Sequence, residues 1–138
     1  MNLQAFLNPK REQNMKYVAS ERFVDENGPI EWEIRSLTSE EDEVLRKACT
    51  KKVPLAGRKG QFIPELDYNQ YAGKLAAACT VYPDLQDRAL QDGYQVMGED
   101  HLLKAMLKPG EYTEYLQKVQ EVNGFHTNIE ELIDEAKN

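Results

Sequence analysis

The feature that most constrains the fold is a helical apolar run that ends at a proline. Residues 68–82 repeat apolar side chains at helical spacing, which predicts one long helix with a buried face. Asp67 is suited to cap its start, and Pro83 ends it because the residue before a proline avoids the helical region. The expected core face consists of Tyr68, Tyr71, Ala72, Leu75, Cys79 and Tyr82.

Other helices are predicted on both sides of this run. Thr38 and Glu41 form a capping box, in which each side chain bonds the backbone amide of the other residue. Gly124 is suited to end a helix that Pro109 opens, because glycine adopts the left-handed conformation after a helix. The expected helices follow Thr38, Asp67, Asp84 or Asp87, Gly98, Pro109 and Asn128.

Before the helices, the pattern predicts a β-hairpin. Residues 16–23 alternate polar and apolar side chains, and the returning strand puts Ile30, Trp32 and Ile34 on one face. Between them stands an Asn-Gly pair at residues 27–28, which favours a tight hairpin turn. An isolated hairpin is only marginally stable, so its apolar face must pack on helices or on another copy of the chain.

Residues 53–66 form the longest stretch without a clear helical or strand pattern. They contain two prolines and two glycines, and Gln61 to Ile63 could form a third short strand. Gly57-Arg58-Lys59-Gly60 falls short of a phosphate-binding loop, which needs four residues between its glycines and then Gly-Lys-Ser/Thr. A flexible surface loop explains the composition without a ligand.

These patterns predict an α+β fold that is mostly helical. We expect an N-terminal two-stranded β-hairpin packed on about five α-helices. The 138 residues fit a single domain, residues 1–138, with a hairpin region over about 14–37 and a helical region over about 38–138.

Net charge, cysteine content and the lack of targeting segments indicate the expected partners and cellular location. The net charge of −7 lies entirely in residues 84–138, because residues 1–83 hold equal numbers of acidic and basic side chains. Acidic surfaces repel phosphate backbones, so nucleic acid is not an expected partner. Cys49 and Cys79 are expected to be buried free thiols. The N-terminus does not resemble a signal peptide and no apolar run is long enough for a membrane span, so we expect a cytoplasmic protein without membrane contact.

The sequence offers no catalytic or metal-binding pattern. His101 and His126 lie far apart, and neither they nor the cysteines have the spacing of metal ligands. No serine stands in a Gly-x-Ser-x-Gly context. We therefore expect no catalytic residues, no metal and no cofactor. A small hydrolase or transferase would require Cys49, Cys79, His101 or His126 to meet a carboxylate in a pocket.

Aromatic residues are the remaining candidates for a partner surface. Trp32, Tyr112 and Tyr115 could contact a partner, since tyrosine and tryptophan are enriched at interfaces. Helical spacing of the tyrosines and the hairpin position of Trp32 are equally compatible with core packing. We also expect self-association, with the hairpin face of Ile30, Trp32 and Ile34 as the contact.

Several stretches resemble, in order and spacing, the XkdN-like tail assembly chaperones of phages and defective prophages. The resemblance runs from about Phe6 to Asn138. It is carried by Glu31-Trp32-Glu33-Ile34, by Leu37-Thr38-Ser39-Glu40-Glu41-Asp42, by Thr80-Val81-Tyr82-Pro83 at the end of residues 74–83, and by residues 16–23, 49–52 and 109–125.

The resemblance implies a non-enzymatic protein in the bacterial host cytoplasm. Such chaperones are thought to coat the tape-measure protein and to recruit subunits of the major tail (tube) protein. The family passes on no site residues that can be placed in this sequence. The alternative from another class is a small nucleic-acid-binding or regulatory prophage protein that uses the basic segment 51–59, with Lys51, Lys52, Arg58 and Lys59.

Overall fold

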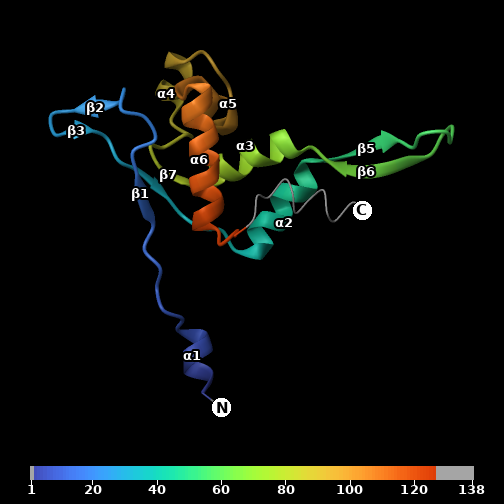
Figure 1. Ribbon diagram of the computed structural model, residues 1–138, viewed down its shortest axis with the longest axis horizontal. Helices are drawn as coiled ribbons and strands as arrows, with labels where there is room; N and C mark the ends of the chain where they lie inside the picture. Colours follow the sequence, from blue (N-terminus) through green and yellow to red (C-terminus); the bar gives the residue numbers. More distant parts are fainter. Residues whose placement is uncertain (1, 127–138) are drawn as a thin grey trace.

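The computed structural model describes residues 2–126 and combines helices with short antiparallel strands (Figure 1). The helices in this part are α1 (Leu3–Leu7), α2 (Ser39–Ala48), α3 (Tyr68–Cys79), α4 (Arg88–Gly93), α5 (Glu99–Met106) and α6 (Pro109–Val122). The strands are β1 (Met15–Tyr17), β2 (Val24–Asp25), β3 (Gly28–Pro29), β4 (Trp32–Ile34), β5 (Thr50–Pro54), β6 (Phe62–Leu66) and β7 (Thr80–Tyr82). The α+β class is confirmed, and the helix expected after Asn128 lies outside the described residues.

Helix α3 is the centre of the fold, with α2, α5 and α6 packed against it (Figure 1). Asp67 caps its start, where the carboxylate accepts a hydrogen bond from the Gln70 amide at 3.1 Å. Small residues let the neighbours approach closely from several sides. The buried positions of α3 are Tyr71, Ala72, Gly73, Leu75, Ala76, Ala77 and Cys79.

The N-terminal strands form a three-stranded sheet instead of the expected two-stranded hairpin. Its strand order is β1-β4-β7, and both pairs are antiparallel. Strand β1 is shorter than residues 16–23, because Ser20 and Phe23 turn toward the core and leave only the two-residue β2–β3 ladder at the turn. The third strand of the sheet, β7, directly follows the C-terminal end of α3.

The end of α3 departs from the predicted helix over residues 68–82. The helix ends at Cys79, and Thr80 takes an extended backbone while its hydroxyl donates to the Ala76 carbonyl at 2.8 Å. Residues 80–82 then pair with β4 as strand β7. The predicted core position of Tyr82 is wrong, since its side chain is 52% exposed.

The stretch 53–66 was predicted as irregular and instead forms most of a hairpin. Strands β5 and β6 pair antiparallel from Thr50 opposite Leu66 to Pro54 opposite Phe62. Gly57 and Gly60 take positive φ values of 76° and 81° in the connecting turn, a conformation that glycine adopts without strain. The possible short strand at Gln61 to Ile63 thus lies at the start of β6.

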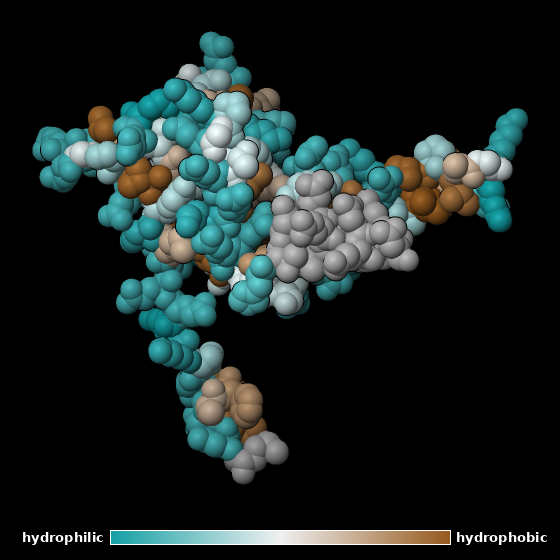
Figure 2. Space-filling view, in the orientation of Figure 1, coloured by the Kyte–Doolittle hydropathy of each residue, from teal (hydrophilic) through white to brown (hydrophobic). Residues whose placement is uncertain are grey.

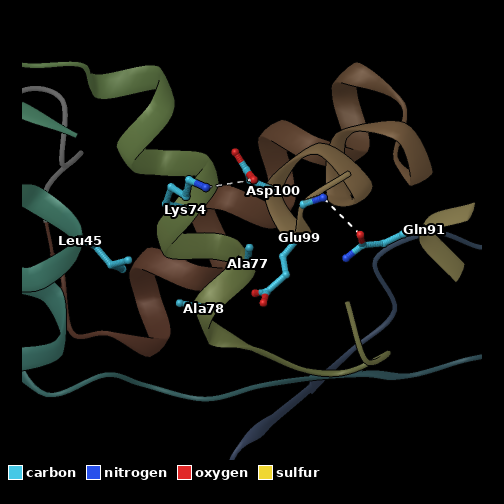
Figure 3. Close-up of a pocket in the computed structure, with 8 residues that line it drawn as sticks. Leu45, Lys74, Ala77, Ala78, Gln91, Glu99 and Asp100 are labelled. Atoms are coloured by element: carbon cyan, nitrogen blue, oxygen red, sulfur yellow. Dashed lines mark hydrogen bonds and ion pairs between the residues drawn. The ribbon is translucent and has the colours of Figure 1, made fainter. Parts of the chain in front are cut away.

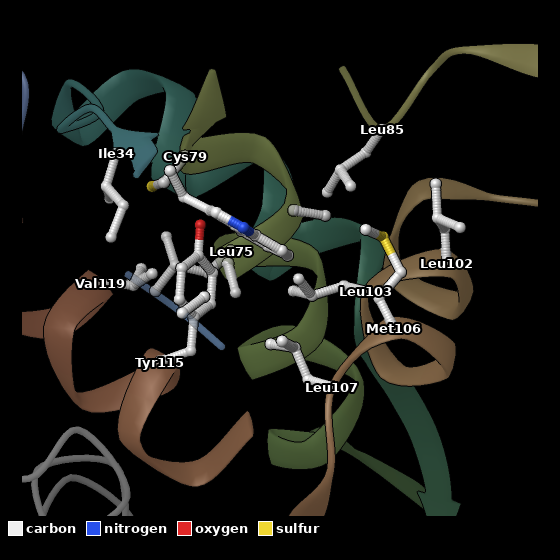
Figure 4. Close-up of a cluster of buried hydrophobic side chains, with 14 of the residues drawn as sticks. Ile34, Leu75, Cys79, Leu85, Leu102, Leu103, Met106, Leu107, Tyr115 and Val119 are labelled. Carbon is white, nitrogen blue, oxygen red and sulfur yellow. The ribbon is translucent and has the colours of Figure 1, made fainter. Parts of the chain in front are cut away.

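The core lies between α3, α5, α6 and the sheet (Figure 4). Trp32 and Tyr115 meet edge to face with ring centres 5.3 Å apart, and Phe23 and Tyr17 lie 6.1 Å from Trp32 and Tyr115 respectively. Such aromatic pairs add stabilisation beyond their buried area. The other large buried side chains are Ile34, Tyr71, Leu75, Leu85, Leu102, Leu103, Met106, Leu107 and Val119.

Helix α2 begins with the predicted capping box. The Thr38 hydroxyl accepts from the Glu41 amide at 3.2 Å, and the Glu41 carboxylate accepts from the Thr38 amide at 3.0 Å. Further along the helix, Asp42 accepts hydrogen bonds from Tyr71 on α3 and from Arg46, the latter at 2.8 Å. This cluster fixes α2 on α3.

Among the elements that project from the body are α1, at the end of an extended N-terminal segment, and the β5–β6 hairpin (Figure 1). We call residues 50–66 the β5–β6 arm. In the space-filling view, apolar side chains gather on both projections (Figure 2). Within residues 2–126, no helix combines the length and the apolar character that crossing a membrane requires.

Candidate partner-binding surface

The groups considered for catalysis are not assembled into a reactive site. Cys49 and Cys79 are buried free thiols, and burial raises the pKa of both. The Cys79 sulfur accepts a hydrogen bond from the Asn123 amide at 3.3 Å, which ties it to the end of α6. His101 on α5 and His126 are both exposed. Among residues 2–126, no cluster of His, Cys, Asp and Glu has the geometry to hold a metal ion.

Two of the three aromatic candidates for partner contact lie in the core. Trp32 is 1% exposed and Tyr115 is fully buried, and the two rings pack on each other. The hairpin face that carries Trp32 and Ile34 is therefore covered by α6 of the same chain. In this conformation neither ring is available to a partner.

Tyr112 is the candidate that keeps an exposed portion. It lies on α6 with its ring half-buried against α3, and burial raises the pKa of its hydroxyl. A Cβ atom built on Gly73 would lie 3.2 Å from the Tyr112 hydroxyl oxygen. Gly73 thus allows the close approach of α6 to α3, and most of the tyrosine serves packing.

Several exposed large apolar side chains lie close together in sequence on each of the two projecting elements. On the β5–β6 arm, Phe62 and Ile63 are 58% and 44% exposed. On α1, Leu3, Phe6 and Leu7 are more exposed still. Contiguous exposed apolar residues mark interaction sites more often than isolated ones do. Sequence reasoning missed the arm, although a glycine-bounded turn between two short runs with valine, phenylalanine and isoleucine was the available signal.

The basic residues of the alternative hypothesis also lie on the arm. Lys51 and Lys52 belong to β5, and Arg58 and Lys59 stand in the turn. Lys51 bonds the Asp67 carboxylate at 3.2 Å, which neutralises one of the four charges. The cations are thus spread along the arm, with Lys51 and Lys52 in β5 and Arg58 and Lys59 in the turn.

A groove runs beside α3, between α2 and α5 (Figure 3). It consists of two hollows of about 270 and 350 Å³ that share Leu45 and Ala78. We call it the α2–α5 groove. Its remaining lining residues are Arg35, Leu37, Glu41, Val44, Lys74, Ala77, Gln91, Gly98, Glu99 and Asp100.

Most charges in this groove are compensated. Lys74 lies 3.3 Å from the buried Asp100 carboxylate, and this ammonium group keeps the pKa of Asp100 below its usual range even though burial opposes the shift. Arg35 pairs with Glu41 at 3.2 Å. Val44, which is 65% exposed on α2, adds apolar surface to the groove. Glu99 is the lining carboxylate without an ion pair within residues 2–126, so the lining carries one excess negative charge. This arrangement suits binding of a protein segment.

Comparison with known proteins gives a consistent result. The family model of the phage XkdN-like tail assembly chaperone proteins (TAC) matches residues 3–137. The PBSX phage-like element protein XkdN of Bacillus subtilis strain 168 is 33% identical over 128 residues, covering 91% of this chain and 85% of that protein. The uncharacterized protein YqbN of the same strain is 33% identical over 121 residues, covering 86% and 80% of the two chains. The crystal structure of YqbN superposes with a TM-score of 0.74 and 25% identity, over 91% of this chain and 98% of that one.

Proposed function

Because the chain belongs to the family of phage XkdN-like tail assembly chaperones, we propose that it binds the tape-measure protein and tail-tube subunits during tail morphogenesis. In this role it holds unassembled tail proteins in the bacterial cytoplasm and catalyses no reaction. The burial of both thiols supports the non-enzymatic part of the proposal, because a buried thiol with a raised pKa is a poor nucleophile.

The observation that carries the proposal is the exposure of large apolar side chains on two elements that project from the body. A chaperone must cover apolar surface that its client exposes before assembly, and exposed apolar patches supply the binding energy for that. The β5–β6 arm presents Phe62 and Ile63, and α1 presents Leu3, Phe6 and Leu7. In a member of this family, such surfaces are suited to unassembled tail proteins.

The test is co-expression with the tape-measure protein and, separately, with the tail-tube protein of the same phage element. We expect each client to stay soluble and to co-purify with the chaperone. The double substitution Leu3→Ser and Phe6→Ser should lower the recovered client. Met97→Ser is the matched control, because Met97 is 88% exposed but lies outside both projections. Equal client solubility with and without the chaperone would refute the proposal.

A further inference from the structure

The β5–β6 arm exposes apolar side chains on both of its faces. Residues directly opposite each other in a hairpin share a face, so Pro54 lies with Phe62 and Val53 lies with Ile63. Neither face is covered at the tip, where Phe62 and Ile63 are among the exposed large apolar residues. A two-stranded hairpin left uncovered in water is only marginally stable. An external surface that covers the arm would therefore stabilise it.

The arm is suited to docking by its side chains and not by its backbone edges. Pro54 and Pro64 have no backbone N–H, so β5 and β6 each lack a donor within the strand. Proline on an exposed strand discourages the addition of a further strand. A groove that accepts the apolar tip is a better match than another strand.

The positive charge of the arm indicates that a groove that binds it should carry acidic side chains. Residues 50–66 carry four basic side chains and one acidic one, a net charge of +3, so that the rest of the chain carries −10. Lys52, Arg58 and Lys59 make no ion pair within residues 2–126. The complementary surface is an apolar groove with an acidic border, and a second copy of this acidic chain can supply one.

The α2–α5 groove has this character. Leu37, Val44 and Leu45 provide apolar lining, and Glu99 on the opposite side has no ion pair within the described part of the chain. Exposed Glu40 and Glu43 stand beside Val44 on α2, and Glu43 also pairs with the exposed Lys47 at 3.5 Å. An apolar tip carrying Phe62 can enter the groove while the cations of the arm approach these carboxylates.

The geometry excludes this contact within one chain. Helix α2 continues into β5 with only Cys49 between them, and the arm extends away from the body (Figure 1). Each five-residue strand spans roughly 17 Å, which carries the tip well beyond the end of α2. The groove borders α2 on its other side, toward α3 and α5. The tip can therefore reach the groove only of another copy.

We propose that the β5–β6 arm of one copy docks into the α2–α5 groove of a second copy. The two surfaces differ, so the contact is head to tail. Repeated from copy to copy, it gives a ring if the rotation between subunits closes and an open chain if it does not. This proposal concerns contacts between copies of the chain, and it does not depend on which tail proteins the chaperone binds.

Sedimentation velocity of the purified protein over a concentration series tests the contact. We expect the average mass to rise with concentration. The double substitution Phe62→Ser and Ile63→Ser should weaken association at least about tenfold, because it removes buried apolar surface from the contact. Val24→Ser, an exposed apolar position on β2 that belongs to neither the arm nor the groove, should leave association unchanged. A wild-type mass that stays monomeric at the highest soluble concentration overturns the proposal.

Charge reversal gives the sharper test. The arm variant is K52E/R58E/K59E, and the groove variant is E40K/E43K/E99K. Each variant alone repels its own kind and should associate at least about fivefold more weakly than the wild type. In an equal mixture, the acidic arm of the first variant meets the basic groove of the second. The basic arm of the second variant likewise meets the acidic groove of the first, so association should return.

Circular dichroism checks that each variant is folded. If the groove variant does not fold, E40Q/E43Q/E99Q replaces it. This neutral variant keeps the wild-type arm and should associate more weakly than the wild type, because its groove has lost the three carboxylates. A mixture that stays dissociated overturns the proposal. So does a Phe62 and Ile63 double variant that associates as strongly as the wild type.

Discussion

The hydroxyl oxygens of Thr80 and Tyr115 lie 2.6 Å apart, although 35 positions separate the two residues in the sequence. Thr80 already donates its only hydroxyl hydrogen to the Ala76 carbonyl, so Tyr115 is the donor in this pair. The bond joins α6 to the residue at which α3 gives way to β7. It therefore links the helical layer to the sheet at their junction.

Replacing Tyr115 with phenylalanine should destabilise the protein by about 1 kcal/mol, the usual net value of one buried hydrogen bond. The ring that packs on Trp32 is retained, so the core stays filled. Urea unfolding measures the change. Tyr82→Phe is the matched control and should have no effect, because Tyr82 is 52% exposed. Equal effects of the two substitutions would contradict a specific role for the Thr80 bond.

Glu111 makes stability depend on acid pH. Its carboxylate lies 2.8 Å from the Arg22 guanidinium and accepts from the Lys108 amide at 2.8 Å. Hydrogen bonding from Arg22, more than from Ser20 and the Lys108 amide, lowers the pKa of Glu111 from 4.5 to about 2. A lowered folded-state pKa means that this stabilisation is complete above pH 4.5 and disappears as the pH falls toward 2.

Glu111→Gln should therefore lower the melting temperature at pH 7 and make little difference at pH 2. The measurement is the difference in melting temperature between wild type and variant across this range, which cancels the titration of other groups. A difference that stays constant from pH 7 to pH 2 would show that the charge of Glu111 does not act through Arg22.

Local signals in the sequence predicted the helix starts well. Thr38 with Glu41, and Asp67, cap α2 and α3 as expected, because a capping bond involves residues within one turn. The end of α3 was missed for the opposite reason. Residues 80–82 become a strand by pairing with β4, whose residues lie about fifty positions earlier, and helical spacing carries no information about such a pairing.

The candidate surface was predicted less well. Trp32 and Tyr115 belong to the residue types that are enriched at interfaces, but their burial depends on how α6 packs on the sheet. The exposure of Phe62 and Ile63 depends on the arm extending away from the body, which sequence spacing does not predict. The family resemblance was confirmed by the match over residues 3–137, since it rests on order along the whole chain.

The capping box of α2 predicts a specific loss of stability. Thr38→Ala removes the acceptor for the Glu41 amide and should cost about 1 kcal/mol. Ser39→Ala is the matched control, because Ser39 is exposed in the first turn and accepts no capping bond. Thermal unfolding of both variants provides the comparison. The interpretation fails if Ser39→Ala costs as much as Thr38→Ala.

Gly73 and Tyr112 should show coupled effects on stability. Gly73 stands in the middle of α3, where alanine would favour the helix by about 1 kcal/mol. The added methyl group, however, would meet the Tyr112 hydroxyl at 3.2 Å, so the ring must shift by a few tenths of an ångström. In the wild-type background these effects oppose each other, and Gly73→Ala should change the free energy of unfolding by less than about 0.5 kcal/mol.

Tyr112→Phe removes the oxygen that causes the close contact. No hydrogen bond of this hydroxyl is found within residues 2–126, so the substitution alone should be nearly neutral. In the background of Tyr112→Phe, the substitution Gly73→Ala should then stabilise the protein by about 0.5–1 kcal/mol. A double-mutant cycle by urea unfolding measures the coupling. An equal effect of Gly73→Ala in both backgrounds would mean that the contact between α3 and α6 does not limit residue size at position 73.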